Sequence, residues 1–224
     1  MRQFSNAQLD GRKRVQAGRR LADDAYLQIR DQIITVSIPP GAPLDEDALA
    51  DELKIGLTPV REALKRLRLE RLAVIYPRRG TFAAEINISD ERWLTEVRVE
   101  LEGLAAALAA ERASEDDLLG LKSLLDTMET ADDPVELMSI DTELHRAIYA
   151  SARNPFLEDT LNQYLNLALR IWHYCLNRMP EHTSHDCDQH AVVRAICDRD
   201  VVAARAAAEE HLRSFSEEVR TLLI

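Results

Sequence analysis

Apolar residues recur at helical spacing through the first third of the chain, in blocks that turn signals separate. The apolar positions of the first block, residues 21–36, are Ala22, Tyr26, Ile29, Ile33 and Val36. This spacing is typical of the buried face of an α-helix. A proline-rich loop, residues 38–43, ends the block. Asp45 then stands where it can cap a short second helix.

A third helix is expected to begin at Thr58 as the N-cap, with Pro59 at its first helical position, and to run to about Leu72. Two short strands follow, at residues 73–76 and 81–84, and residues 77–80 form the turn between them. Gly80 suits a turn position with positive φ. Three helices followed by a two-stranded hairpin predict a winged helix-turn-helix.

From Ser89 onward the pattern is helical and no stretch has the alternation of a strand. Six helices are expected, at about 89–113, 114–130, 134–151, 155–178, 184–198 and 200–222. The predicted fold class is therefore mainly α: an amino-terminal winged helix-turn-helix, made of three helices and a small β-hairpin wing, followed by an all-α bundle of six or seven helices.

These patterns divide the chain into four segments. They are a flexible basic arm, the winged helix-turn-helix domain, a linker and the all-α domain, at residues 1–20, 21–84, 85–92 and 93–224.

Charge separates the two domains more sharply than composition does. Residues 1–84 hold 15 Lys plus Arg against 11 Asp plus Glu, a net charge of +4, whereas the remaining residues hold 13 against 28, a net charge of −15. The basic first domain keeps nucleic acid open as a partner, although the whole chain is acidic, with a net charge of −11.

No stretch approaches the roughly 20 apolar residues that span a bilayer, and three cysteines are too few for a disulfide framework. We expect a cytoplasmic protein without a membrane partner.

The third helix has the composition of a recognition helix. Its apolar positions can pack inward while a polar and basic set projects outward: Thr58, Arg61, Lys65 and Arg68. Such a helix can enter the major groove of double-stranded DNA, and Arg78, Arg79 and Gly80 at the hairpin turn suit the minor groove or the phosphate backbone. The alternative for each residue alone is a solvated basic surface.

Three stretches of this first domain resemble the DNA-binding domain of the GntR family of bacterial transcription regulators. They are residues 44–50, 58–64 (Thr-Pro-Val-Arg-Glu-Ala-Leu) and 77–80 (Pro-Arg-Arg-Gly). The resemblance covers residues 21–84. Two features depart from the family: Gly56 and Leu57 stand where it usually has Ser-Arg, and Arg71 stands where it has Gly.

Histidines of the second domain share helix faces with apolar residues. Asp141 and His145 are four residues apart and lie on one face, and His190 and His211 lie on apolar faces of two later helices. A carboxylate on an apolar face needs a partner, which points to an ion pair, a metal or an exposed edge. A buried histidine bonded to a backbone carbonyl is the simpler explanation of each His alone.

Residues 93–222 resemble the FCD-type effector domain of the FadR-like branch of the same family. Many such domains bind a divalent metal through one Asp and three His, and the resemblance implies Asp141, His145, His190 and His211 in those roles. Zinc or nickel suits a histidine-rich set. The family's usual Glu before the third ligand is Gln189 here.

The resemblance also places an effector-binding arginine at Arg98, where a small organic acid could bridge the guanidinium and the metal. The alternative is an Arg98–Glu102 helix pair. We expect a homodimer that binds an inverted repeat and releases it when the acid binds, hence a repressor. A metalloenzyme that uses the same Asp and His residues, and a regulator whose metal is purely structural, are the alternatives; no HExxH or HxxEH signature occurs in the chain.

Overall fold

The computed structural model describes residues 20–87, 89–176 and 189–222. Most of the predicted arm at residues 1–20 and the start of the helix predicted at 184–198 lie outside these residues. The chain divides into two compact units between Ile86 and Asn87. None of the described helices is long and apolar enough to cross a membrane.

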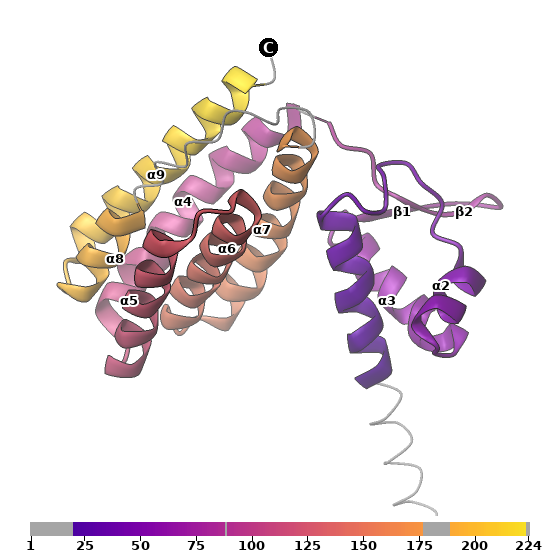
Figure 1. Ribbon diagram of the computed structural model, residues 1–224, viewed down its shortest axis with the longest axis horizontal. Helices are drawn as coiled ribbons and strands as arrows, with labels where there is room; N and C mark the ends of the chain where they lie inside the picture. The colour runs from indigo at the N-terminus through magenta and orange to yellow at the C-terminus, as the bar shows by residue number, and fades with distance from the viewer. Residues whose placement is uncertain (1–19, 88, 177–188, 223–224) are drawn as a thin grey trace, which may run out of the picture. The chain divides into compact units, whose positions relative to one another are not determined.

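The first unit is a winged helix-turn-helix (Figure 1). A helix over residues 20–34 is followed by two further helices and an antiparallel hairpin, α2 (Glu46–Leu53), α3 (Leu57–Leu69), β1 (Ala73–Tyr76) and β2 (Gly80–Ala83). The Asp45 side chain accepts a hydrogen bond from the Ala48 N–H and so caps α2, as predicted. Ile29 and Ile33 on the first helix and Val60 and Leu67 on α3 are fully buried in the core.

The ends of α3 differ from the prediction. The helix begins at Leu57 with Gly56 as its N-cap, so Thr58 is not the cap. Pro59 lies in the third position of the first turn, where proline is tolerated because the first N–H groups of a helix have no partner within it. The helix ends at Leu69 rather than Leu72.

The second unit is all α-helical in the residues that the structure describes. Its elements are α4 (Ser89–Arg112), α5 (Glu115–Thr130), α6 (Pro134–Ser151), α7 (Pro155–Leu176), α8 (Gln189–Cys197) and α9 (Val201–Leu222). The mainly α fold class is thereby confirmed, with six described helices in the second domain. Ser114 forms a capping box with Asp117 at the start of α5, and Asp133 caps α6.

Helix α4 lies at the centre of this bundle and packs most extensively against α9 (Figure 1). Small side chains lie at this contact: Ala106 and Ala110 on α4 and Ala204 and Ala208 on α9 belong to one buried cluster. Small residues let two helix backbones approach closely. Helices α6, α7 and α8 also contact α4, so polar groups on their inner faces are brought near one another.

Candidate functional site

One face of α3 is polar and exposed because the opposite face supplies the core. Val60, Ala63, Leu64 and Leu67 are buried at helical spacing. The four predicted DNA-contacting residues of this helix, which we call the recognition face, are all exposed: Thr58, Arg61, Lys65 and Arg68. Leu57, where the family usually has Arg, occupies the first position of the helix and is partly buried.

Two arginines of α3 already have partners within the first unit. Arg61 Nε lies 2.6 Å from Glu46 Oε2 on α2, and both side chains remain well exposed. Arg66, which the sequence left outside the DNA-contacting set, pairs with Asp23 at 2.6 Å and lies 3.9 Å from the centre of the Tyr26 ring. An exposed ion pair contributes little to stability, so the Arg61 guanidinium is available to a phosphate or a base.

The hairpin turn presents the other three predicted DNA-contacting residues. Gly80 has a φ of 101°, the positive value that the sequence predicted, and Arg78 has a φ of 63°. The Arg79 N–H donates to the Tyr76 carbonyl at 3.1 Å, which closes the turn. Arg78, Arg79 and Gly80 are all exposed, as a wing that contacts DNA requires.

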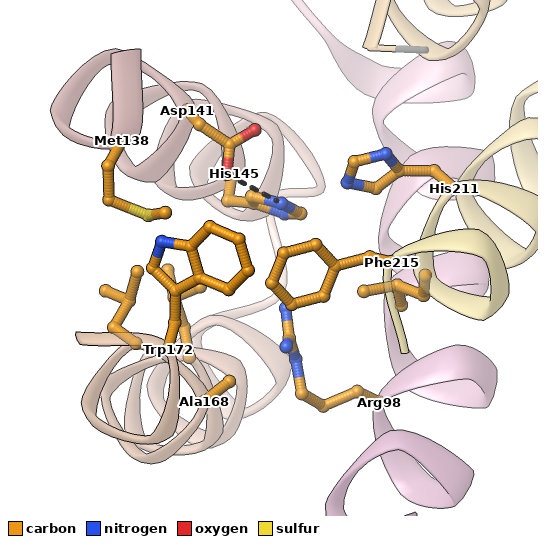
Figure 2. Close-up of a pocket in the computed structure, with 11 residues that line it drawn as sticks. Arg98, Met138, Asp141, His145, Ala168, Trp172, His211 and Phe215 are labelled. Carbon is orange, nitrogen blue, oxygen red and sulfur yellow. Dashed lines mark ion pairs between the residues drawn. The ribbon is translucent and has the colours of Figure 1, made fainter. Parts of the chain in front are cut away.

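Three of the four predicted metal ligands converge inside the second unit (Figure 2). Asp141 and His145 come from α6 and His211 from α9, and one ligand atom from each lies within 4.8 Å of the others. All three residues are buried. We call these three residues the Asp/His cluster.

A buried carboxylate on α4 orients one ring of the Asp/His cluster. Glu102 Oε2 lies 2.9 Å from His145 Nδ1, while Glu102 Oε1 accepts from Arg98 Nε at 2.7 Å and lies 2.6 Å from its Nη2. Tyr149 Oη lies 3.3 Å from the same His145 nitrogen. When Nδ1 carries the proton and its N–H donates a hydrogen bond to Glu102, the Nε2 atom has a lone pair available for a metal. Carboxylates orient metal-binding histidines in this way. The sequence missed this role of Glu102, although its spacing of four from Arg98 was a signal.

The fourth predicted ligand, His190, does not join the cluster. His190 lies on the outer side of α8, partly exposed, with its Nε2 2.9 Å from Glu129 Oε1 on α5. Its neighbour Gln189 is 1% exposed and places its amide nitrogen against all three residues of the cluster. One residue along a helix is a rotation of about 100°, so the two side chains cannot face the same way.

The charges around the cluster shift pKa values in opposite directions. Burial lowers the pKa of His145, but the carboxylates of Glu102 and Asp141 outweigh burial and leave that pKa raised. Burial and the neighbouring His145 lower the pKa of His211 to about 4. Burial alone would raise the pKa of Glu102, but Arg98 and then His145 lower it to about 2. The two imidazoles therefore differ in how readily protons compete for them.

A pocket beside the cluster contains the predicted effector-binding arginine (Figure 2). Its cavity is small, about 20 Å³, and continues into open solvent. Arg98 and the Asp/His cluster supply its polar lining, and apolar side chains from α6, α7 and α9 supply the rest, among them Trp172 and Phe215, whose ring centres lie 5.0 Å apart. A lining of this kind, apolar with a few convergent polar groups, is typical of small-molecule sites.

Comparison with known families assigns both units. Residues 21–83 match the gntR family of bacterial regulatory proteins, and residues 93–214 match the FCD domain. Among proteins of similar sequence is an uncharacterized HTH-type transcriptional regulator in an unstable DNA locus of Streptomyces ambofaciens, 28% identical over 92% of this chain and 87% of its own. The HTH-type transcriptional regulator McbR of Escherichia coli strain K12 is 30% identical over 60% of this chain and 62% of its own.

Solved structures agree on the fold. Escherichia coli McbR/YncC has a TM-score of 0.80 at 24% identity, covering 91% of this chain and 99% of that one. A putative transcriptional regulator GntR from Rhodococcus sp. RHA1 has a TM-score of 0.71 at 20% identity, covering 89% and 97%. The family and its members are transcriptional regulators and not enzymes, which decides against the metalloenzyme alternative.

Proposed function

This chain belongs to the GntR family of DNA-binding transcription regulators and carries an FCD domain, and we propose that a small organic acid, bound in a metal-containing pocket of that domain, controls its binding to operator DNA. The observation that carries the proposal is the Asp/His cluster at the wall of a pocket that also holds a buried arginine. Metal, acid and DNA are then three ligands of one chain, and each can shift the affinity for the others.

The residues of the cluster fit a divalent metal ion. Two imidazoles and one carboxylate suit zinc or nickel, and the Glu102 carboxylate behind His145 holds that ring with Nε2 toward the cluster. Asp141, His145 and His211 would hold the ion. A bound divalent ion would supply positive charge for a ligand carboxylate. His190 is a metal ligand only by prediction from the sequence. In the structure its side chain faces Glu129, so it is left out of this ligand set.

Arg98 is the residue proposed to select an acid. Its guanidinium lines the pocket next to the cluster and is 4% exposed. An arginine holds a carboxylate through charge and paired hydrogen bonds. The pairing with Glu102 favours a second candidate, in which Arg98 only neutralises Glu102 and the metal has a purely structural role.

Operator binding is assigned to the recognition face and the wing. The recognition face would enter the major groove, with Arg78, Arg79 and Gly80 on the minor groove or the backbone.

We propose a homodimer on an inverted repeat, because a single winged helix offers little contact for specificity. Trp93 and Val97, four residues apart on α4, are 61% and 44% exposed, which leaves an apolar strip for a second copy to cover. Release of DNA on acid binding would make the protein a repressor.

A screen of small carboxylic acids by thermal shift tests the proposal. It compares the zinc-loaded wild type, the zinc-loaded Arg98→Ala variant and the metal-free wild type. An acid that stabilises only the zinc-loaded wild type and releases operator DNA supports both the arginine and the metal. Acids that stabilise all three forms equally would leave neither with a role in binding. Zinc binding with no acid response would favour the structural metal.

A further inference from the structure

The amide of Gln189 lies where the ligand atoms of the Asp/His cluster converge. Its Nε2 atom is 2.8 Å from Asp141 Oδ1, 3.1 Å from His145 Nε2 and 3.0 Å from His211 Nε2. The side chain is 1% exposed and belongs to the first turn of α8. One nitrogen thus contacts every residue of the cluster.

The neighbours determine which end of the amide faces inward. An ionised carboxylate only accepts hydrogen bonds, so an amide oxygen 2.8 Å from Asp141 Oδ1 would face another acceptor with no proton between them. The NH₂ group therefore points into the cluster and donates to Asp141 Oδ1, and it lies within hydrogen-bond distance of the Nε2 atoms of both imidazoles.

A metal ion would need the same electron pairs. The Nε2 atom of a neutral imidazole has a single lone pair in the plane of the ring. That pair either accepts an amide hydrogen or binds a cation, and the Gln189 nitrogen occupies the point between Asp141, His145 and His211 where an ion bound to all three would lie. Gln189 in its present position and a metal bound to both rings are therefore mutually exclusive.

We propose that Gln189 is an internal competitor of the metal: its NH₂ group holds the Asp/His cluster together in the metal-free protein, and a metal ion binds only when this amide withdraws. The inference rests on the proposed metal site and adds a regulatory element to it. Since Gln189 belongs to the first turn of α8, metal binding changes what holds that turn in place. The measured metal affinity is lowered by the fraction of the protein in which the amide occupies the cluster.

Three variants of the full chain, stripped of metal with a chelator, test the competition. Gln189→Ala removes the amide, Gln189→Met removes it while nearly keeping the side-chain volume, and Gln163→Ala makes the same change at an exposed position of α7. The melting temperature without metal and the affinity for Zn²⁺ alone, measured by calorimetry against a competing chelator, are compared with those of the wild type.

Both Gln189 variants are expected to melt below the wild type without metal and to bind Zn²⁺ about tenfold more tightly, because the ion no longer displaces hydrogen bonds. Gln163→Ala is expected to match the wild type in both measurements. A fall in Zn²⁺ affinity in both Gln189 variants would identify the amide as a ligand and overturn the inference. An affinity within twofold of the wild type would overturn it as well.

The outcomes also separate this inference from the proposed function. A wild type that binds Zn²⁺ without any gain in the variants overturns the competition and leaves the metal site intact. Variants that bind Zn²⁺ when the wild type does not would support the competition and remove the metal from the function of the natural chain. Failure of every form to bind zinc, nickel or manganese overturns both.

Discussion

The recognition face of α3 and the Asp/His cluster are built in opposite ways. The recognition face comes from a single helix, and its side chains are exposed and long enough to reach a ligand from several positions. The cluster takes its residues from α6 and α9, buries all of them, and brings Gln189 from α8 against them. A small rotation of α3 would still present basic groups to DNA, whereas a rotation of α8 by one residue exchanges Gln189 for His190.

This difference shows where local sequence is sufficient. The exposed face needs only that the apolar positions of α3 pack inward, and helical periodicity ensures this. The cluster needs several helices to present their residues at one point, which depends on how each helix is rotated and shifted in the bundle. Substitutions should therefore have large and specific effects in the cluster and graded effects on the recognition face.

The largest effect is expected for the cluster ligands themselves. His211→Ala should abolish stoichiometric binding of zinc, because it leaves only two residues of the cluster. His190→Ala should change zinc affinity by no more than about threefold if the side chain keeps its place beside Glu129. Metal content by elemental analysis and calorimetric titration measure both. A loss of metal in His190→Ala equal to that in His211→Ala would support the sequence prediction over the observed orientation of α8.

Glu102→Gln should have the next largest effect. Loss of an outer carboxylate that orients a metal-binding histidine typically lowers metal affinity by about 10–100-fold. Calorimetric titration with zinc measures the loss, and the affinity of the metal-free variant for operator DNA should stay at the wild-type value. Glu100→Gln, an exposed change on the same helix, is the matched control. Equal zinc affinity in the two variants would show that Glu102 does not act through His145.

Acid should release the metal, with the uptake of one proton for each ion released. Metal-binding histidines must be neutral. The pKa of His145 is raised above its usual value and that of His211 is lowered to about 4, so at any pH above about 4 protons compete chiefly at His145. Zinc affinity should fall about tenfold per pH unit as the pH drops below the raised pKa of His145. A fall in zinc affinity of about a hundredfold per pH unit would mean that both rings titrate together. That result would contradict the difference between the pKa values of His145 and His211.

On the recognition face, Arg61→Ala should weaken binding to the specific operator by about 1–3 kcal/mol and relax preference at one base pair. Arg79→Ala on the wing should weaken specific and random DNA alike. Glu46→Ala frees Arg61 without removing it and is the matched control for loss of the ion pair. Fluorescence anisotropy at fixed salt measures all three. Equal losses on both DNAs for Arg61→Ala would assign it to the backbone.

The smallest effect concerns the end of α3. Arg71 is exposed and has a φ of 62°, a left-handed conformation that favours glycine, the residue usual at this position in the family. Arg71→Gly should raise the free energy of unfolding by about 0.5–1 kcal/mol. Arg199 has a φ of 59°, but its guanidinium donates to the Ala113 carbonyl at 2.6 Å. Arg199→Gly should therefore give no such gain, and urea unfolding compares the two. An equal gain at both positions would show that this hydrogen bond is worth little.

The sequence determined the order and type of the elements. Periodicity and caps predicted every described helix and both strands, with ends displaced by a few residues where turn residues allow several start points, as Thr58 and Leu57 illustrate. It also determined which side of α3 is basic and exposed. These are local properties, because burial of the apolar face of a helix leaves the opposite face exposed to solvent.

Tertiary structure decided how the Asp/His cluster is assembled. Asp141 and His145 share a face by their spacing, and α8 presents Gln189 to them because Gln189 lies on the buried face of that helix with Val192, Val193 and Ile196, at i, i+3, i+4 and i+7. Only the packing of α6, α8 and α9 brings these faces together at one point. Glu102 behind His145 also became visible only when α4 and α6 were packed together. Periodicity specifies what a helix buries, while the packing of its neighbours specifies what the buried polar groups meet.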